Sequence, residues 1–319
     1  MLTKARTLAL SILMCVAAAC VPAAPSTTQQ VVQYDPTKTT MGQIQKRGTL
    51  VIGVPDDFYP FGYVGAPPGP GSSAKTSTSK KPAGFTVALG KLVANALGVK
   101  ATYLPLPSAQ LLGAVDKNRA DLVFPMVPIT EAGLSAHPFT DPYFIAHQRL
   151  LVPQGSTLRN VRDLNGRSVC SAIDPNTEIL LNRLVPSISL LSVGSALRCL
   201  GPLRAKKVVA ATAPDAALMG LRALLPASQI VGDQLTTEGY GAAVSACNAL
   251  FAEFVTRVFS DTKASGQWSA LYNRWVGPAS GSGPTPIAPS MTVVDASDLF
   301  PSTTGKPSHP TVTCHTPSG

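Results

Sequence analysis

Acidic side chains lie beside an aromatic residue just after the apolar run at residues 50–54. Asp56 and Asp57 follow the run at residues 50–54 and directly precede Phe58. A carboxylate pair next to a ring suits a cationic or polyhydroxylated ligand, because carboxylates accept charge-assisted hydrogen bonds and the ring packs against the ligand's apolar part. The same residues are also typical of a solvated loop that binds nothing.

A further acidic candidate and one basic candidate lie later in the chain. Asp215 follows Pro214 at the start of an apolar-periodic segment. It either contacts a ligand or begins a helix, since Pro is favoured at the first helical position and an acid in the first turn interacts well with the helix dipole. Arg149 either binds a ligand's carboxylate or lies on the surface, as most arginines do.

Sequence motifs for catalysis or metal binding are absent. The packed part of the chain has no Gly-x-Ser-x-Gly motif and no phosphate-binding Gly-rich loop. The four histidines, His137, His147, His309 and His315, form no His-Glu-x-x-His motif. Cys314 beside His315 supplies only two adjacent ligands, too few for a closed metal site. We expect no catalytic residue, no metal and no cofactor.

The N-terminus predicts export. Residues 1–19 carry Lys4 and Arg6 before an apolar run that is too short to span a membrane. The sequence Ala-Ala-Ala-Cys at residues 17–20 predicts lipidation of Cys20, although Ala-x-Ala also suits ordinary signal peptidase. We therefore expect a protein anchored by lipid on the extracytoplasmic side of the cell membrane, or a periplasmic or secreted protein if Cys20 is not lipidated.

The chain has 319 residues, 45% of them hydrophobic, which is enough for two lobes with separate cores. The formal charge is +9, a balance that some nucleic-acid-binding proteins share. The basic cluster Arg204, Lys206 and Lys207 has no interleaved aromatic residues, so it predicts a solvated helix end. We expect no nucleic-acid partner.

Strand and helix patterns alternate along most of the chain. A helical face begins at Phe85 and stops near Gly98, and Ser108 is placed to cap a helix that buries Leu111 and Val115. A last helix carries an apolar face from Phe251 to Phe259. Strands are expected at residues 50–54, 122–124, 168–171, 188–193, 208–211 and 229–231. Such alternation predicts parallel sheets covered by helices.

Three segments lack this periodicity. A tether at residues 20–40, a flexible insertion at 65–82 and a disordered tail at 279–319 are rich in Pro, Ser, Thr or Gly. Without apolar residues to bury, they are expected to lie outside the core.

The stretch Asp-Leu-Val-Phe-Pro-Met-Val-Pro-Ile-Thr at residues 121–130, with Phe-Thr-Asp-Pro-Tyr at 139–143, resembles a segment of the amino-acid-type (family 3) extracellular solute-binding proteins of ABC importers. The chain also resembles actinobacterial glutamate/glutamine-binding lipoproteins, and the resemblance keeps the family's order over about three quarters of the chain. Its other parts are Gly-Thr-Leu-Val-Ile-Gly-Val at 48–54, Tyr-Pro-Phe at 59–61, Gly-Phe-Thr-Val-Ala-Leu at 84–89, Asp-Leu-Asn-Gly-Arg at 163–167, Gly-Gln-Trp at 266–268 and Tyr-Asn-Arg-Trp at 272–275.

The resemblance implies an α/β fold, a periplasmic-binding-protein-like type II clamshell of two lobes, each with a mostly parallel sheet covered by helices. Lobe one would comprise residues 41–147 plus 240–278, and lobe two residues 148–239. The chain would cross between them near 147–152 and return near 238–244, with a ligand between the lobes and no second subunit.

In the family, an Arg binds the ligand's carboxylate, an Asp binds its ammonium, and an aromatic ring packs against its side chain. The resemblance places the Arg at Gly133, a hydroxyl at Pro128 and the Asp at Pro214. We therefore expect weak binding of ordinary α-amino acids, because an unpaired buried charge costs several kcal/mol. The ligand-binding candidates that remain are Asp57, Phe58, Phe61, Met126, Thr130, Thr140, Asn176 and Asp215.

Four cysteines remain after Cys15 and Cys20, and an even set in an oxidising compartment favours disulfides. Relatives with Cys at the positions of Cys170 and Cys199 imply a bridge between these two, against the alternative of two buried free thiols. A second bridge from Cys247 to Cys314 would hold the tail.

The residues and the resemblance together predict a solute-binding protein that captures a small polar solute, amino-acid-like or an amine, and delivers it to an ABC permease. One alternative is a degenerate binding module that acts as a sensor or a protein-interaction scaffold. Another is a dehydratase-like enzyme on the same fold, which needs a carboxylate acid or base in the cleft, and only Asp56, Asp57 and Asp215 qualify.

Overall fold

The computed structural model describes residues 31–69, 81–172, 175–281 and 286–295, without the side chains of Pro175 and Asn176. The chain divides into compact units at residues 1–31 and 32–319, and the helices and strands that the structure describes belong to the second. The predicted signal, Cys20 and Cys314 lie outside the described residues. Within the described part, no helix combines the length and the apolar character that a membrane span requires.

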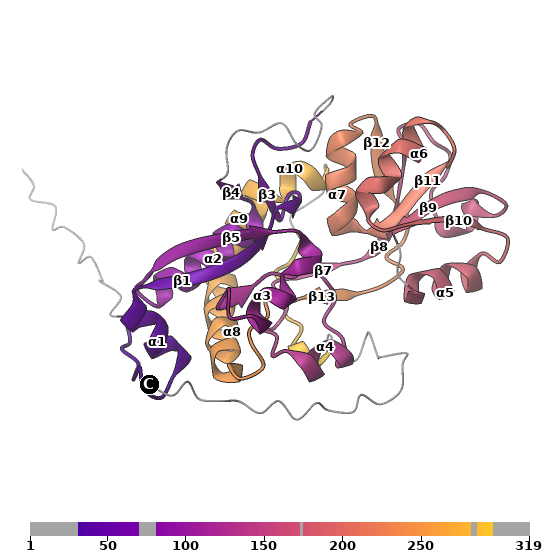
Figure 1. The fold of residues 1–319 in the computed structure, drawn as a ribbon. Coiled ribbons are helices and arrows are strands. Elements are labelled where there is room, and N and C mark those ends of the chain that lie inside the picture. The colour runs from indigo at the N-terminus through magenta and orange to yellow at the C-terminus, as the bar shows by residue number, and fades with distance from the viewer. Residues whose placement is uncertain (1–30, 70–80, 173–174, 282–285, 296–319) are drawn as a thin grey trace, which may run out of the picture. The chain divides into compact units, whose positions relative to one another are not determined.

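Lobe one is built on a parallel sheet of strand order β5-β1-β6, and β5 and β1 lie side by side in Figure 1. The central strand is buried along almost its whole length, which suits a parallel sheet covered on both faces. The strands are β1 (Thr49–Pro55), β5 (Lys100–Leu106) and β6 (Leu122–Val123), and the helices that link them are α2 (Phe85–Ala96) and α3 (Leu112–Asp116). The strands predicted at 50–54 and 122–124 are confirmed, as is the helix from Phe85.

The start of α2 depends on a glycine. Gly84 has φ +129°, and a Cβ there would lie 2.3 Å from the carbonyl oxygen of Phe61. Only a residue without a side chain lets the small sheet pass this close to the helix. That sheet contains β2 (Asp57–Phe58), β3 (Gly62–Val64) and β4 (Pro82–Ala83).

The remaining elements of lobe one are α1 (Thr40–Arg47), the 3-10 turn η1 (Ser108–Gln110), α4 (Glu131–Ala136), α8 (Ala249–Ala264), α9 (Gln267–Trp275) and α10 (Gly277–Ser280). The predicted last helix is confirmed as α8, whose buried face includes Phe251 and Phe259. Aromatic rings form the centre of this core, where the Trp268 indole nitrogen donates to the Tyr143 carbonyl at 2.7 Å. Each such buried side chain contributes about 1.5–3 kcal/mol.

Lobe two is built on a sheet of strand order β10-β9-β11-β8-β12. Its first three strands are parallel, and β8 runs antiparallel to both of its neighbours. The strands are β8 (Gln148–Pro153), β9 (Ser168–Ala172), β10 (Ser189–Val193), β11 (Ala210–Pro214) and β12 (Ser228–Val231). The helices and 3-10 turns are η2 (Val161–Leu164), α5 (Pro175–Leu184), η3 (Ala196–Cys199), α6 (Leu200–Arg204) and α7 (Asp215–Leu224).

Two segments connect the lobes. The chain leaves lobe one through β7 (Phe144–Ala146) and returns through β13 (Glu238–Tyr240), and these strands pair antiparallel (Figure 1). The observed connections lie close to the crossings expected from the resemblance. The two-lobed α/β clamshell with mostly parallel sheets is confirmed.

One disulfide joins β9 to η3 in lobe two. Cys170 and Cys199 are bonded with a Cα–Cα distance of 5.7 Å, and both are fully buried. The predicted bridge is therefore confirmed, and the alternative of two free thiols is wrong. Cys247 is also disulfide-bonded, and its proposed partner Cys314 lies outside the described residues.

Three local predictions are wrong. Ser108 does not cap a helix, because it is the first residue of η1 and its hydroxyl donates to Asp57. The predicted insertion includes Pro82, which pairs with Val64 in the small sheet. The tail is not wholly unpacked: Ala279 is buried in α10, and Ala288, Met291 and Val293 contact the cores of lobe one. Scattered apolar residues among prolines gave no periodic signal for this packing.

Candidate functional site

Asp56 and Asp57, the acidic pair after β1, differ in their surroundings. The Asp57 carboxylate accepts hydrogen bonds from the backbone N–H and the hydroxyl of Ser108, at 3.0 and 2.7 Å. It therefore holds the η1 turn. The Asp56 carboxyl is half-buried, and this burial, together with the neighbouring charge of Asp57, raises its pKa. Asp56 has the more perturbed environment of the two, although Asp57 was the predicted ligand residue.

The two candidate rings differ in exposure. Phe58 is half-buried and packs edge-on against Phe61, with ring centroids 6.0 Å apart. Phe61 is 0% exposed and contacts Phe85 and Phe144 in the aromatic core. Phe58 therefore has surface to offer a ligand, and Phe61 positions it.

The segment after β6 places Met126 and Thr130. Met126 has φ +51°, a left-handed conformation that non-glycine residues rarely adopt and that is enriched at ligand sites. Its sulfur accepts a hydrogen bond from the Tyr143 hydroxyl at 3.3 Å, and the side chain is 5% exposed. The Thr130 hydroxyl caps α4 by accepting from the backbone N–H of Gly133 at 2.9 Å.

Gly133 stands where the resemblance places the carboxylate-binding Arg. A Cβ on this residue would lie 3.2 Å from the Thr130 hydroxyl oxygen and 3.6 Å from the ring of Phe139. The first turn of α4 contains Glu131 and no basic side chain. This helix start therefore offers a carboxylate ligand no cation.

Two further candidates are placed differently. Thr140 is fully buried: its hydroxyl donates to the Asp141 carbonyl at 2.9 Å and accepts from the Ala242 backbone at 3.0 Å. It ties the loop before β7 to the returning chain. Asn176 lies in the first turn of α5, and its side chain is outside the described residues.

Asp215 begins α7, as one of its two predicted roles required. Its backbone N–H donates to the His147 carbonyl at 2.8 Å, and its carboxylate accepts from the His147 backbone N–H at 3.2 Å. The His147 ring is fixed in turn, since Nδ1 lies 2.7 Å from the Thr236 carbonyl oxygen and therefore donates to it. Burial raises the pKa of Asp215. The residue joins lobe two to the chain segment that leaves lobe one.

A cavity of about 580 Å³ adjoins Asp215, and we call it the hinge pocket. Its polar lining consists of His147, Arg149, Asp215, Gln234 and Ser280. Its apolar lining consists of Phe144, Ile145, Met219, Ile230, Trp268, Tyr272, Pro286, Ile287 and Pro289. Neither Phe58, Met126 nor Thr130 lines it. Sequence reasoning named Asp215 and Arg149 separately and missed the pocket, because its lining comes from segments far apart in the chain.

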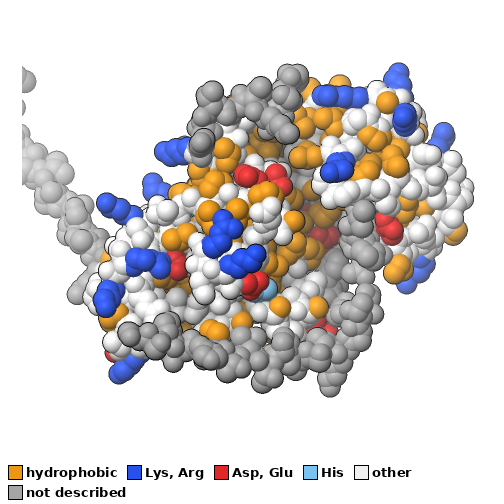
Figure 2. Space-filling model, viewed as in Figure 1, with side chains coloured by type: hydrophobic (Ala, Val, Ile, Leu, Met, Phe, Trp, Pro, Cys, Tyr) orange, Lys and Arg blue, Asp and Glu red, His pale blue; other side chains and the backbone are white. Residues whose placement is uncertain are grey.

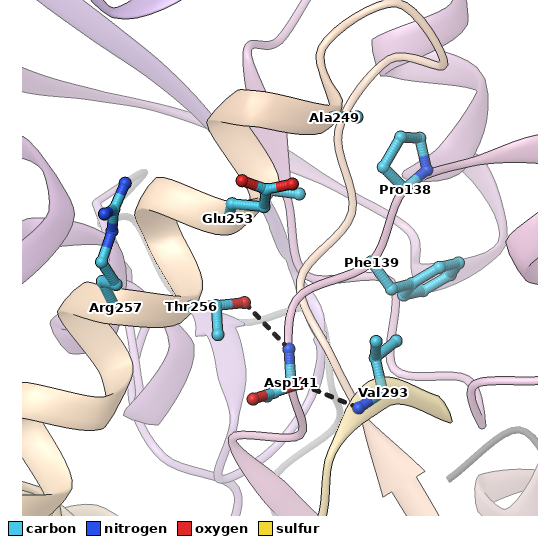
Figure 3. Close-up of a pocket in the computed structure, with 9 residues that line it drawn as sticks. Pro138, Phe139, Asp141, Ala249, Glu253, Thr256, Arg257 and Val293 are labelled. Atoms are coloured by element: carbon cyan, nitrogen blue, oxygen red, sulfur yellow. Dashed lines mark hydrogen bonds between the residues drawn. The ribbon is translucent and has the colours of Figure 1, made fainter. Parts of the chain in front are cut away.

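A second cavity of about 450 Å³ lies on lobe one beside α8 (Figure 3). Asp141 organises it: its backbone N–H donates to the Thr256 hydroxyl at 3.1 Å, and its carboxylate accepts from the Val293 backbone at 2.8 Å. Glu253 and Arg257 add opposite charges to the lining. No predicted ligand residue contacts this cavity, which the tail segment partly borders.

Charged side chains elsewhere do not gather into a site. On the face shown in Figure 2, Lys and Arg side chains are scattered without forming a continuous basic surface. Among the residues that the structure describes, no group of three His, Cys, Asp or Glu side chains is placed to hold a metal ion.

Comparison with known proteins agrees with this architecture. Residues 50–278 match the family described as bacterial extracellular solute-binding proteins, family 3. The ABC transporter glutamine-binding protein of Bacillus subtilis is 26% identical over 243 residues, covering 75% of this chain and 85% of that protein. The L-cystine-binding protein of Escherichia coli K12 is 23% identical over 240 residues, covering 74% and 86%. A crystal structure of a mutant ArgBP from T. maritima superposes with a TM-score of 0.59 at 25% identity, covering 74% and 99%.

Proposed function

The chain belongs to the bacterial extracellular solute-binding proteins, family 3, and we propose that it captures a small polar solute between its lobes and delivers it to an ABC permease. The two α/β lobes joined by paired connecting segments support a capture role, because such a fold can enclose a ligand between two rigid bodies. The relatives named for glutamine and cystine support a solute of similar size.

The observation that supports the proposed solute class most directly is the start of α4. Thr130 caps this helix onto Gly133, and no cation is present in its first turn. A ligand carboxylate facing Gly133 would be desolvated without a partner, which costs on the order of 2–5 kcal/mol, or about 30-fold or more in affinity. Phe58 and the half-buried Asp56 instead favour a neutral or cationic solute, such as an amine, over an ordinary α-amino acid.

A thermal-shift screen of the purified protein tests the class. The panel contains α-amino acids, amines, sugars and organic acids, each at high concentration. A ligand at a hundred times its Kd adds about 2.7 kcal/mol to the free energy of unfolding, which raises Tm by several degrees. We expect the largest shifts from amines or neutral polar compounds. Shifts confined to α-amino acids would contradict the proposed class.

Matched variants locate the binding. Asp56→Asn should weaken binding of a cationic hit at least tenfold, because it removes the charge beside Phe58. Asp57→Asn is the control, since that carboxylate is already bound to Ser108. Recovery of the bound compound unchanged after long incubation would support binding without catalysis, whereas turnover would favour the dehydratase-like alternative.

A further inference from the structure

The hinge pocket contains two side chains of opposite charge that do not pair with each other. Asp215 and Arg149 both line it, yet no ion pair within 4.0 Å joins them. The carboxylate accepts hydrogen bonds from the backbone N–H groups of His147 and Ala216, and Arg149 donates through Nε to the Gly232 carbonyl at 3.2 Å. Each side chain is therefore oriented by the backbone, and although the charge of Arg149 acts on Asp215, neither forms an ion pair within 4.0 Å among the described residues.

The fold explains why both charges face the same cavity. Arg149 lies opposite Ala213 in the antiparallel pairing of β8 with β11. Ala213 is two residues before Asp215, the first residue of α7. His147 and Arg149 are two residues apart in an extended segment, so their side chains leave the chain on the same side. The sheet register thus brings a carboxylate and a guanidinium to the edge of one pocket.

Three aromatic rings also line the pocket. Phe144 stacks on Tyr272 with centroids 6.5 Å apart and an angle of 11°, and Trp268 stacks on Tyr272 at 5.3 Å and 21°. All three rings belong to lobe one, whereas Asp215, Met219 and Ile230 belong to lobe two. The volume of about 580 Å³ lies within the usual range of small-molecule sites, roughly 300–1,000 Å³.

We propose that the hinge pocket is a second binding site, separate from the solute site near Phe58, and that it takes a small dipolar molecule with one cationic and one anionic group on an apolar body. The cationic group would pair with Asp215 and the anionic group with Arg149, while the body packs against Tyr272 and Trp268. A purely cationic molecule would face the charge of Arg149, and a purely anionic one the charge of Asp215. This site does not depend on the proposed transport role.

The test uses the full purified chain and a series of linear ω-amino acids in which the amine and the carboxylate are separated by one to five carbons. Matched alkylamines and alkanoic acids of the same length lack one charge. Binding is measured by calorimetry and by tryptophan fluorescence, because Trp268 lines the pocket. We expect at least one member of the series to bind at least tenfold more tightly than both of its singly charged analogues.

Variants assign that binding to the pocket. Asp215→Asn and Arg149→Gln should each weaken it at least tenfold. Arg119→Gln, which changes an exposed Arg outside the pocket, and Phe58→Ala should leave it unchanged. The asparagine retains an acceptor for the His147 N–H, and Arg149→Gln provides an independent test if Asp215→Asn does not fold.

Three results would overturn the inference: no binding by any ω-amino acid, equal binding by a singly charged analogue, or binding that survives both pocket variants. Binding that only Phe58→Ala abolishes would place the compound in the solute site, which also overturns the second site. Tight binding of an α-amino acid that Phe58→Ala abolishes would contradict the proposed solute class. The hinge-pocket inference would then still be tested by Asp215→Asn and Arg149→Gln.

Discussion

At the residue scale, hydrogen bonds decide which of the candidate side chains stay available to a ligand. Asp57 is bound to Ser108, Thr130 to the start of α4, and Thr140 to two backbone groups. Phe58 and Asp56 are half-buried and keep exposed surface, and Asp215 lines the hinge pocket. The resemblance indicates candidate segments, while the partner of each polar atom depends on chain segments brought together only by folding.

Asp215 makes a prediction about pH. Burial raises its pKa in the folded protein. A carboxyl with a raised folded pKa stabilises the fold fully below its unfolded pKa, and this contribution is lost as the pH rises through the folded value. Asparagine does not titrate, so the stability of Asp215→Asn relative to the wild type should increase as the pH rises above about 4, the ordinary pKa of an Asp. Denaturant unfolding at several pH values measures the difference.

Asp163 provides a control of opposite sign. Backbone N–H groups of Arg159 and Asn160 lower its pKa, so its contribution is present above the unfolded pKa and is lost as the pH falls. The relative stability of Asp163→Asn should therefore decrease as the pH rises through the acid range. Equal pH profiles for the two variants would refute the assignment.

At the element scale, regular strands and helices could be predicted because burial and periodicity are local properties of sequence. Residues 50–54 are buried on both faces in a parallel sheet, and the apolar run shows this directly. The η1 turn and the packed tail could not be predicted, because their order comes from distant partners such as Asp57 and Asp141. The hinge pocket could not be predicted for the same reason. In the sequence, Trp268 and Tyr272 are four residues apart and indicate only a helix face that packs in the core.

Gly84 should be intolerant of substitution. Gly84→Ala introduces a Cβ at 2.3 Å from the Phe61 carbonyl oxygen and keeps φ in a region that alanine disfavours, so we expect a loss of more than about 2 kcal/mol. Gly113→Ala is the matched control, because a Cβ there meets nothing within 4 Å and alanine favours helix α3. Chemical denaturation should show a gain of up to about 1 kcal/mol for the control. A similar effect of both changes would contradict the close approach.

The disulfide in lobe two should stabilise the fold. Cys170 and Cys199 are 29 residues apart in sequence, and closing such a loop stabilises by about 3–4 kcal/mol in the chain-entropy description. We expect the double variant Cys170→Ser/Cys199→Ser to unfold at a correspondingly lower denaturant concentration. Peptide mapping without reductant provides the direct check, and free thiols at both positions would exclude the bridge.

At the scale of the whole molecule, anchoring to the membrane stays a prediction from sequence, since Cys20 lies outside the described residues. Two acyl chains make membrane attachment durable, and lipidation of an N-terminal Cys supplies a diacylglyceryl group. Cys20→Ala should therefore shift the protein from the membrane fraction to the soluble fraction, with the wild type as the reference. An unchanged distribution would refute lipid anchoring.

Calorimetric titration of the purified protein with glutamine, glutamate and the strongest amine from the thermal-shift screen tests the central claim most directly. With no cation at Gly133, the two amino acids should bind weakly or not at all at the solute site near Phe58, while the amine binds there and depends on Asp56 and Phe58. A sub-micromolar Kd for glutamine or glutamate that Phe58→Ala abolishes would contradict the account, because it would show that the solute site still pairs both charges of an α-amino acid.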